Sequence, residues 1–244
     1  MAKTVLITGC NRGIGREAVR VFAEHGYDLI CCIRRPNDEF ASYIAELSEK
    51  HAVVIDLLYF DMADESAIKA ALTPLIKSNR KIDVLVNNAG IASGGLLHMT
   101  SMAKLKEVFQ INFFSQVLIT QLVSKLMIRH KCGSIINMGS LGGIETNPGY
   151  LSYGASKAAM IWATKSIAKE LAPFGIRVNG IAPGLINTDM GNYKDEREIK
   201  KTIERTAMHR MGQTKEIADA ILFMASEHSS FITGHILVID GGRM

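Results

Sequence analysis

The sequence predicts an α/β fold, in which a doubly wound parallel sheet of about seven strands carries helices on both faces. One observation is a series of short, nearly continuous apolar runs, which are typical of strands that are covered on both sides. A second is that amphipathic stretches of helical length separate these runs in strict alternation. No linker, repeat or low-complexity segment divides the chain, so residues 1–244 are expected to form a single domain.

Val, Ile and Leu dominate the expected strands, because β-branched and aliphatic side chains favour a pleated, buried surface. In chain order these strands are Thr4–Thr8, Leu29–Ile33, Val53–Leu58, Val84–Val86, Ser134–Met138, Ile176–Ile181 and Ile236–Ile239. The amphipathic stretches between them predict helices at Gly15–His25, Asp38–Lys50, Glu65–Lys77, Met102–Arg129, Tyr153–Leu171 and Lys215–Ser226. The polar, charge-dense segment 185–212 interrupts the alternation, and it is expected to form a lid on the substrate side.

The composition is that of a soluble globular protein, with 48% hydrophobic and 21% charged residues among 244. Polar amides interrupt the longest uncharged stretches and the amino terminus does not resemble a secretory signal, so a cytoplasmic protein without a membrane span is expected. The net charge of +4 is too diffuse to indicate nucleic-acid binding. The four cysteines lack zinc-site spacing, so no metal is expected.

A glycine-rich turn follows the first expected strand and leads directly into a helix. It reads Gly9-Cys-Asn-Arg-Gly-Ile-Gly15. Glycines let the backbone approach a pyrophosphate, and the helix supplies unpaired N–H groups at its positive end. An ordinary tight turn could look the same, but the position between the first strand and the first helix favours a dinucleotide site.

The end of the second strand indicates which dinucleotide is bound. An NAD enzyme places a carboxylate there for the ribose hydroxyls, whereas this chain has Arg34 and Arg35 after Ile33. Guanidinium groups bind a 2′-phosphate bidentately, and Arg12 in the glycine turn could add a second cation. NADP(H) is therefore predicted, although both arginines could be solvated loop charges and the nearby Asp38 keeps NAD open.

The residues with the clearest chemistry are Ser140, Tyr153 and Lys157. Tyr153 and Lys157 are four apart, so they share one face of a helix, and Ser140 follows a strand at the edge where ligands bind. A neighbouring ammonium is expected to lower the pKa of the phenol, and the serine hydroxyl could hold a carbonyl oxygen. Tyr-x-x-x-Lys alone is common by chance, but the serine and the nucleotide turn together favour a catalytic site. Asn112, an amide in an apolar helix, must bond locally or support a polar path.

With these motifs, the sequence resembles the short-chain dehydrogenase/reductases along nearly its whole length. The shared segments are Thr8-Gly9-x-x-x-Gly13-x-Gly15, Asp61, Asn87-Asn88-Ala89-Gly90, Asn112, Ser140, Tyr153-x-x-x-Lys157 and Pro183-Gly184 followed by Thr188. The resemblance implies a Rossmann-type domain that transfers hydride between nicotinamide and a carbonyl or alcohol carbon.

The resemblance also implies roles for these residues. Tyr153 would be the general acid in reduction, Lys157 would lower its pKa and hold the nicotinamide ribose, and Ser140 would orient the carbonyl. Asn112 would support a water relay. The cofactor would contact Gly9, Asn11, Arg12, Gly13, Ile14, Gly15, Arg34, Arg35, Asp61 at the adenine, Met62, Asn88, Ala89, Gly90, Tyr153, Lys157, Pro183, Gly184, Ile186 and Thr188.

Within this family the chain is most similar to the bacterial beta-ketoacyl-acyl-carrier-protein reductases. The likeness implies a beta-ketoacyl thioester as the leading substrate, a role in fatty acid biosynthesis, and a homotetramer formed through the Met102–Arg129 and Tyr153–Leu171 helices. Those reductases dock the acidic carrier protein on two basic residues near the site; Lys131 matches the first, whereas Phe174 stands at the second. This departure weakens the case for an acyl-carrier partner.

Two other functions remain open from the sequence. One is a dehydrogenase or reductase of a sugar, small ketone or other secondary alcohol, and the other is a binding protein that senses nucleotides without turnover. The intact Ser140, Tyr153 and Lys157 argue against the sensor, which needs no tuned phenol. Apolar side chains suggest a hydrophobic substrate pocket, although they could equally be packing residues: Leu96, Leu97, Ile144 and Met190.

Overall fold

The computed structural model describes residues 2–191 and 196–243, and it confirms the predicted fold class. Within these residues, one sheet has the strand order β3-β2-β1-β4-β5-β6-β7, and all neighbouring strands run parallel. The strands are β1 (Thr4–Thr8), β2 (Asp28–Ile33), β3 (Ile55–Tyr59), β4 (Val84–Asn87), β5 (Gly133–Met138), β6 (Ile176–Pro183) and β7 (Ile236–Ile239). Each begins and ends within two residues of its predicted range.

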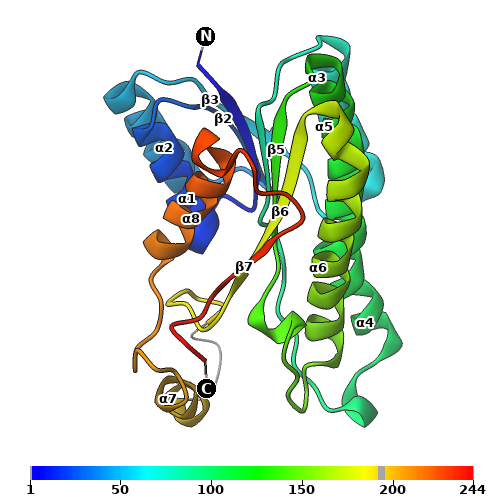
Figure 1. The fold of residues 1–244 in the computed structure, drawn as a ribbon, viewed down its shortest axis with the longest axis vertical. Helices are drawn as coiled ribbons and strands as arrows, with labels where there is room; N and C mark the ends of the chain where they lie inside the picture. Colours follow the sequence, from blue (N-terminus) through cyan, green and yellow to red (C-terminus); the bar gives the residue numbers. More distant parts are fainter. Residues whose placement is uncertain (1, 192–195, 244) are drawn as a thin grey trace.

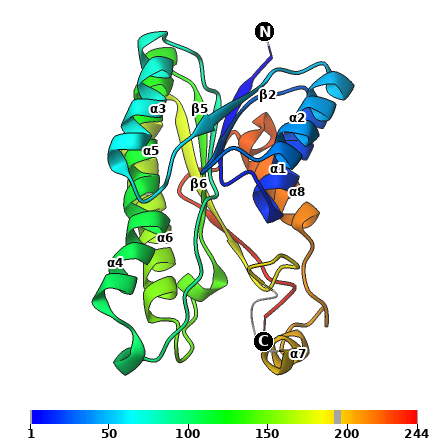
Figure 2. The same cartoon turned by 180° about the vertical axis from the view of Figure 1, so that it is seen from behind.

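Helices cover both faces of this sheet (Figure 1), and Figure 2 shows the same two layers from behind. One layer consists of α1 (Gly13–Glu24), α2 (Asp38–His51) and α8 (Thr214–Ala225); the other contains α3 (Glu65–Lys77), α5 (Ser115–His130) and α6 (Leu151–Leu171). Successive residues of a strand point to opposite faces of the sheet: Cys31 lies in the core under α1, and Cys32 lies in the core under α3. The continuous apolar runs are therefore explained by burial on both sides.

The helix starts differ in how their N–H groups are satisfied. The Asn37 and Asp64 side chains accept hydrogen bonds from the first turns of α2 and α3. α1 has no such cap, because Arg12 precedes it and no acidic residue occupies its first turn. The amino end of α1 is consequently free to attract an anionic group.

The predicted helix Met102–Arg129 is divided in the structure. α4 (Met102–Phe109) passes into a π-helical turn at Gln110–Phe114, where the Ser115 N–H donates to the Gln110 carbonyl, and α5 follows. An apolar periodicity alone does not distinguish a π turn from an α-helix, because both keep the apolar stripe facing the core. The wide turn sets the position of Asn112.

The stretch Met102–His130 is long and apolar enough to cross a membrane by length and composition, but half of its most apolar window is buried inside the protein. α5 packs against the sheet through Ile119, Val123 and Leu126. We therefore interpret the stretch Met102–His130 as a core segment of the domain and not as a membrane span.

The segment predicted to form a lid contains a helix that the sequence did not indicate, α7 (Glu196–Glu204). Figure 1 shows α7 apart from both helical layers, close to the carboxyl terminus of the chain. Residues 192–195 of the predicted lid lie outside the described residues. Most residues of α7 face solvent, which explains why this segment carries so many charged side chains.

Candidate active site

A cleft of about 1350 Å³ opens at the carboxyl edge of the sheet. It is larger than the roughly 300–1,000 Å³ typical of small-molecule pockets, so it has room for a dinucleotide together with a substrate. All the residues predicted to contact the cofactor line it, and Ser140 lies there too. Asn112 is the exception, being buried behind the wall. The cleft lies where the strand order reverses between β1 and β4, the position at which doubly wound sheets bind ligands.

The glycine turn packs so closely that side chains are excluded. A Cβ on Gly15 would lie 2.1 Å from the Gly9 carbonyl oxygen and 2.5 Å from Asn88 Nδ2, and Gly9 itself has a φ of +72°. The turn therefore presents bare backbone and the uncapped end of α1 to the cleft. These features fit the pyrophosphate of a dinucleotide.

The Asn88 side chain fastens this turn to β4. Its Nδ2 donates to the carbonyls of Thr8 at 2.9 Å and Gly9 at 3.1 Å, while Thr8 Oγ1 accepts from the N–H groups of Asn88 and Ala89. Asn88 lines the cleft as predicted, but these bonds show that its amide nitrogen positions the turn.

The adenosine end of the cleft holds charged groups of both signs. Arg34 Nε lies 2.8 Å from Asp61 Oδ2, and both side chains are substantially exposed. Such an exposed ion pair contributes little to stability, so an incoming phosphate could compete for the guanidinium. Arg35 is exposed and forms no ion pair with any residue in the described part of the chain. Arg12, the other predicted cation, lies 3.4 Å from Asp189 on the opposite wall.

The predicted catalytic side chains meet at the other end of the cleft. Ser140 and Tyr153 both line the cleft, close enough for the serine hydroxyl to act on the pKa of the phenol, and Ser140 Oγ accepts a hydrogen bond from the Gly142 N–H. Lys157 is 5% exposed, and its Nζ lies 6.0 Å from the centre of the Tyr153 ring. The serine comes from the loop after β5 and the other two from α6, and the structure brings all three side chains to one cleft.

The lowered pKa predicted for the Tyr153 phenol is not seen in this structure. Burial raises the pKa of Tyr153 above its usual value, and the hydrogen bond with Ser140, which lowers the pKa, does not offset it. Lys157 Nζ donates instead to the Met138 carbonyl at 2.7 Å, and burial lowers the pKa of this lysine to about 8. The Lys157 side chain thus lines the cleft with its Nζ bonded to the backbone of β5.

Asn112 makes three hydrogen bonds with neighbouring groups. Its Oδ1 accepts from the Ile91 N–H at 2.8 Å, and its Nδ2 donates to the Ile91 carbonyl at 2.9 Å and to Ser156 Oγ at 3.1 Å. A Cβ on Gly90 would lie 3.1 Å from Asn112 Oδ1 and 3.5 Å from Lys157 Nζ. The side chain of Asn112 thus fixes the loop after β4 beside the lysine.

Three further residues line this end that the sequence reasoning did not single out. Tyr150 packs edge-on to Tyr153 with ring centres 6.4 Å apart, and its helical spacing of three could have been noticed. Glu145 and Arg243 also line the cleft, and nothing in the sequence links them. Of the predicted apolar lining, Leu96 and Met190 line the cleft, while Leu97 and Ile144 are exposed outside it.

The two positions compared with a carrier-protein dock lie away from this cluster. Lys131 and Phe174 are neighbours, since a Cβ on Gly175 would lie 2.6 Å from the Lys131 carbonyl oxygen. They precede β5 and β6, whereas Ser140 follows the far end of β5. The structure therefore places them at the opposite edge of the sheet from the cleft.

In sequence and in fold, the chain is similar to known reductases and dehydrogenases. The family described as enoyl-(acyl carrier protein) reductase matches residues 9–243. The 3-oxoacyl-acyl-carrier-protein reductase of Thermotoga maritima is 38% identical over 242 residues, which is 98% of this chain and 97% of that protein.

Two solved structures carry a bound NADP. ElxO with NADP is 33% identical, with a TM-score of 0.88, and the match covers 99% of this chain and 98% of that one. A gluconate 5-dehydrogenase from Burkholderia cenocepacia, in complex with NADP and tartrate, is 32% identical with a TM-score of 0.90, covering 98% of this chain and 94% of that one.

Proposed function

Because this chain belongs to the short-chain dehydrogenase/reductase family of NAD(P)-dependent oxidoreductases acting on CH–OH groups, we propose that it reduces a ketone to a secondary alcohol with NADPH. The observation that carries the proposal is the cluster of Ser140, Tyr153 and Lys157 in one cleft with the glycine turn. When bound, NADPH supplies the hydride. Ser140 holds the carbonyl oxygen, and Tyr153 donates the proton that completes the alcohol.

The protonation state of Tyr153 is compatible with reduction. A phenol is protonated at neutral pH at its ordinary pKa, and burial, which raises the pKa of Tyr153, keeps the proton on the hydroxyl until it is donated. Oxidation of an alcohol would need the phenolate as a base, which burial disfavours. Asn112, through its bonds to the loop after β4, keeps the neighbourhood of Lys157 in place and supports a water path for reprotonation.

The leading substrate is a beta-ketoacyl thioester, which would give the enzyme a role in fatty acid biosynthesis. The similarity to the 3-oxoacyl-acyl-carrier-protein reductase of Thermotoga maritima supports this substrate. A sugar or small ketone is the alternative, which the likeness to a gluconate 5-dehydrogenase supports. The placement of Lys131 and Phe174 gives no support to a carrier protein docked beside the cleft. A screen of NADPH consumption over acyl thioesters, sugar ketones and small ketones decides between them. Consumption with none of these classes would refute the proposed function.

We further propose NADP(H) as the preferred cofactor, with Arg34 and Arg35 at the 2′-phosphate. The expected result is a higher kcat/KM with NADPH than with NADH, and Arg34→Asp should reduce that ratio by about tenfold or more, since it places a second carboxylate beside Asp61. Arg34→Gln, which removes the cation without adding repulsion, should give a smaller loss. Equal use of the two cofactors by the wild type would contradict the assignment.

Lys157 should make cofactor affinity depend on pH. Its pKa of about 8 means that the ammonium predominates below pH 8 and is lost as the pH rises through that value. If this ammonium holds the nicotinamide ribose, NADPH binding raises the pKa of Lys157, and affinity should fall severalfold between about pH 7 and about pH 9.5. Fluorescence titration measures this, and Lys157→Met should bind weakly with little pH dependence. The same pH profile in both proteins would contradict the role.

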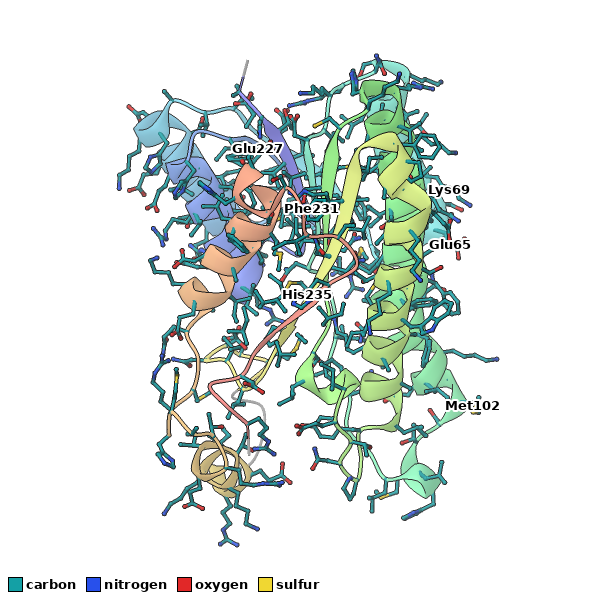
Figure 3. The ribbon with its side chains drawn as sticks, viewed as in Figure 1. Glu65, Lys69, Met102, Glu227, Phe231 and His235 are labelled. Carbon is teal, nitrogen blue, oxygen red and sulfur yellow. The ribbon has the colours of Figure 1, made fainter. Side chains whose placement is uncertain are left out.

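We also propose a homotetramer that acts in the cytoplasm. Large apolar side chains are exposed beside α5, on α6 and before β7; they are Phe114, Trp162 and Phe231. Met102 is exposed too, and Figure 3 shows it at the outer end of α4. Exposed patches of this kind mark protein interfaces. Light scattering should give four times the 26.7 kDa chain mass, and a monomer would refute the assembly.

A further inference from the structure

A nearly buried arginine at the carboxyl end of the chain lines the catalytic cleft. The Arg243 side chain is 10% exposed and forms part of the cleft wall. Backbone contacts fix its position: the Ala207 N–H donates to the Gly242 carbonyl at 2.9 Å, and Thr206 pairs with Arg243 in an antiparallel bridge. The guanidinium is therefore held in place by the segment that follows α7.

The charge of this guanidinium is poorly satisfied. Its Nε is buried and makes no hydrogen bond to any residue in the described ranges, and the Glu145 carboxylate is 3.7 Å away. Its Nη1 donates to the Thr202 carbonyl at the long distance of 3.4 Å. A buried cation needs close acceptors, because its desolvation cost is otherwise not offset. An anionic ligand in the cleft would supply them.

The Arg243–Glu145 contact crosses the substrate end of the cleft. Glu145 follows Ser140 by five residues, and its N–H donates to the Leu141 carbonyl at 2.8 Å, so it belongs to the loop that carries the catalytic serine. An anion bound to Arg243 would therefore lie near the loop whose serine hydroxyl holds the ketone.

Other charged side chains line the same end. Lys201 of α7 and Arg205, which directly follows α7, are cationic, and Glu198 of α7 is anionic. Counted together with Arg243 and Glu145, cations outnumber acids by one among these lining residues. The field at this end thus favours a negatively charged substrate.

We propose that Arg243 is a specificity-determining residue that binds an ionised carboxylate on the ketone substrate, and that Glu145 partners the guanidinium until the substrate arrives. The planar guanidinium group can donate two parallel hydrogen bonds to the two oxygens of a carboxylate. This inference rests on the proposed carbonyl reduction. The carboxylate has two sources, a free keto acid or an acyl thioester whose chain ends in a second carboxyl group.

Paired substrates that differ in one charge test the proposal. The first pair consists of two thioesters of N-acetylcysteamine, an uncharged thiol: the neutral 3-oxohexanoyl thioester and the 3-oxoadipyl thioester, which ends in a carboxylate. The second pair consists of the neutral methyl acetoacetate and the anion acetoacetate. Arg243→Met should raise KM for the carboxylate member by about tenfold or more and leave the neutral member within about twofold. The pair that responds identifies the source of the carboxylate. Lys77→Met, which removes an exposed cation from α3, is the control and should change neither.

Two further variants separate recognition of charge from loss of structure. Arg243→Lys keeps a cation and should recover part of the selectivity. Glu145→Gln removes the competing carboxylate and should lower KM for the acidic substrates severalfold. Equal effects of Arg243→Met on both members of each pair, or no effect on either, would mean that Arg243 only braces the segment after α7.

A binding measurement keeps the failure of this inference separate from failure of the proposed reaction. Adipate has no ketone, so its binding to the enzyme–NADPH complex in isothermal titration calorimetry needs no turnover. Adipate should bind the wild type and bind Arg243→Met about tenfold or more weakly, while dimethyl adipate should not distinguish them. If adipate binds both proteins alike or neither, the carboxylate site is refuted, whatever the ketone screen shows.

Discussion

Replacing Tyr153 with phenylalanine should lower kcat for ketone reduction by about 10²–10⁴-fold, the range that positioned general acids contribute. The ring and its edge contact with Tyr150 are kept, and only the hydroxyl near Ser140 is lost. The substrate would then have to take its proton from water. Steady-state NADPH oxidation with the substrate identified by the screen measures the loss.

Cofactor binding and stability are the controls for this variant. The NADPH dissociation constant and the melting temperature should change little, since the packing of α6 is preserved. Tyr59→Phe, which removes a hydroxyl at the exposed end of β3, should keep full activity. A Tyr153→Phe enzyme that retains more than about a tenth of the wild-type kcat would show that another group donates the proton.

Gly15→Ala is expected to weaken cofactor binding strongly and to destabilise the fold. A methyl group there would lie 2.1 Å from the Gly9 carbonyl oxygen, which is backbone and cannot rotate away. Either α1 or the turn must shift, and overpacking of this kind costs about 1–3 kcal/mol. NADPH titration should show at least a tenfold weaker complex, and thermal unfolding should show a lower midpoint.

Gly26→Ala separates these two effects. Gly26 has a φ of +73°, so alanine is strained there, but no atom lies within 4 Å of the new methyl group. This variant should lose stability and keep its affinity for NADPH. If Gly15→Ala binds NADPH as tightly as Gly26→Ala does, the close packing of the glycine turn is not needed for the cofactor.

The fold could be predicted because its signals are local. Apolar runs such as Thr4–Thr8 gave the strands to within two residues, since burial on both faces imposes a composition that is visible along a few positions. Tyr153 and Lys157 could be placed together for the same reason, because the helical repeat alone sets them on one face. Ser140 followed from its place at the end of a strand.

Contacts between distant segments could not be predicted. The pairing of Arg34 with Asp61 and the approach of Arg243 to Glu145 join segments that no periodicity relates. The π turn at Asn112 escaped detection because it preserves the apolar stripe of a regular helix.

The sequence by itself determined the alternation of strands and helices, the glycine turn and the residues of the catalytic cluster, because each depends on spacing within one element or on its order along the chain. Only the tertiary structure decided that burial raises the pKa of Tyr153 and lowers that of Lys157, and that Arg243 lines the cleft. The physical reason is that desolvation and electrostatic pairing depend on every group packed around an atom, and those groups come from remote parts of the chain.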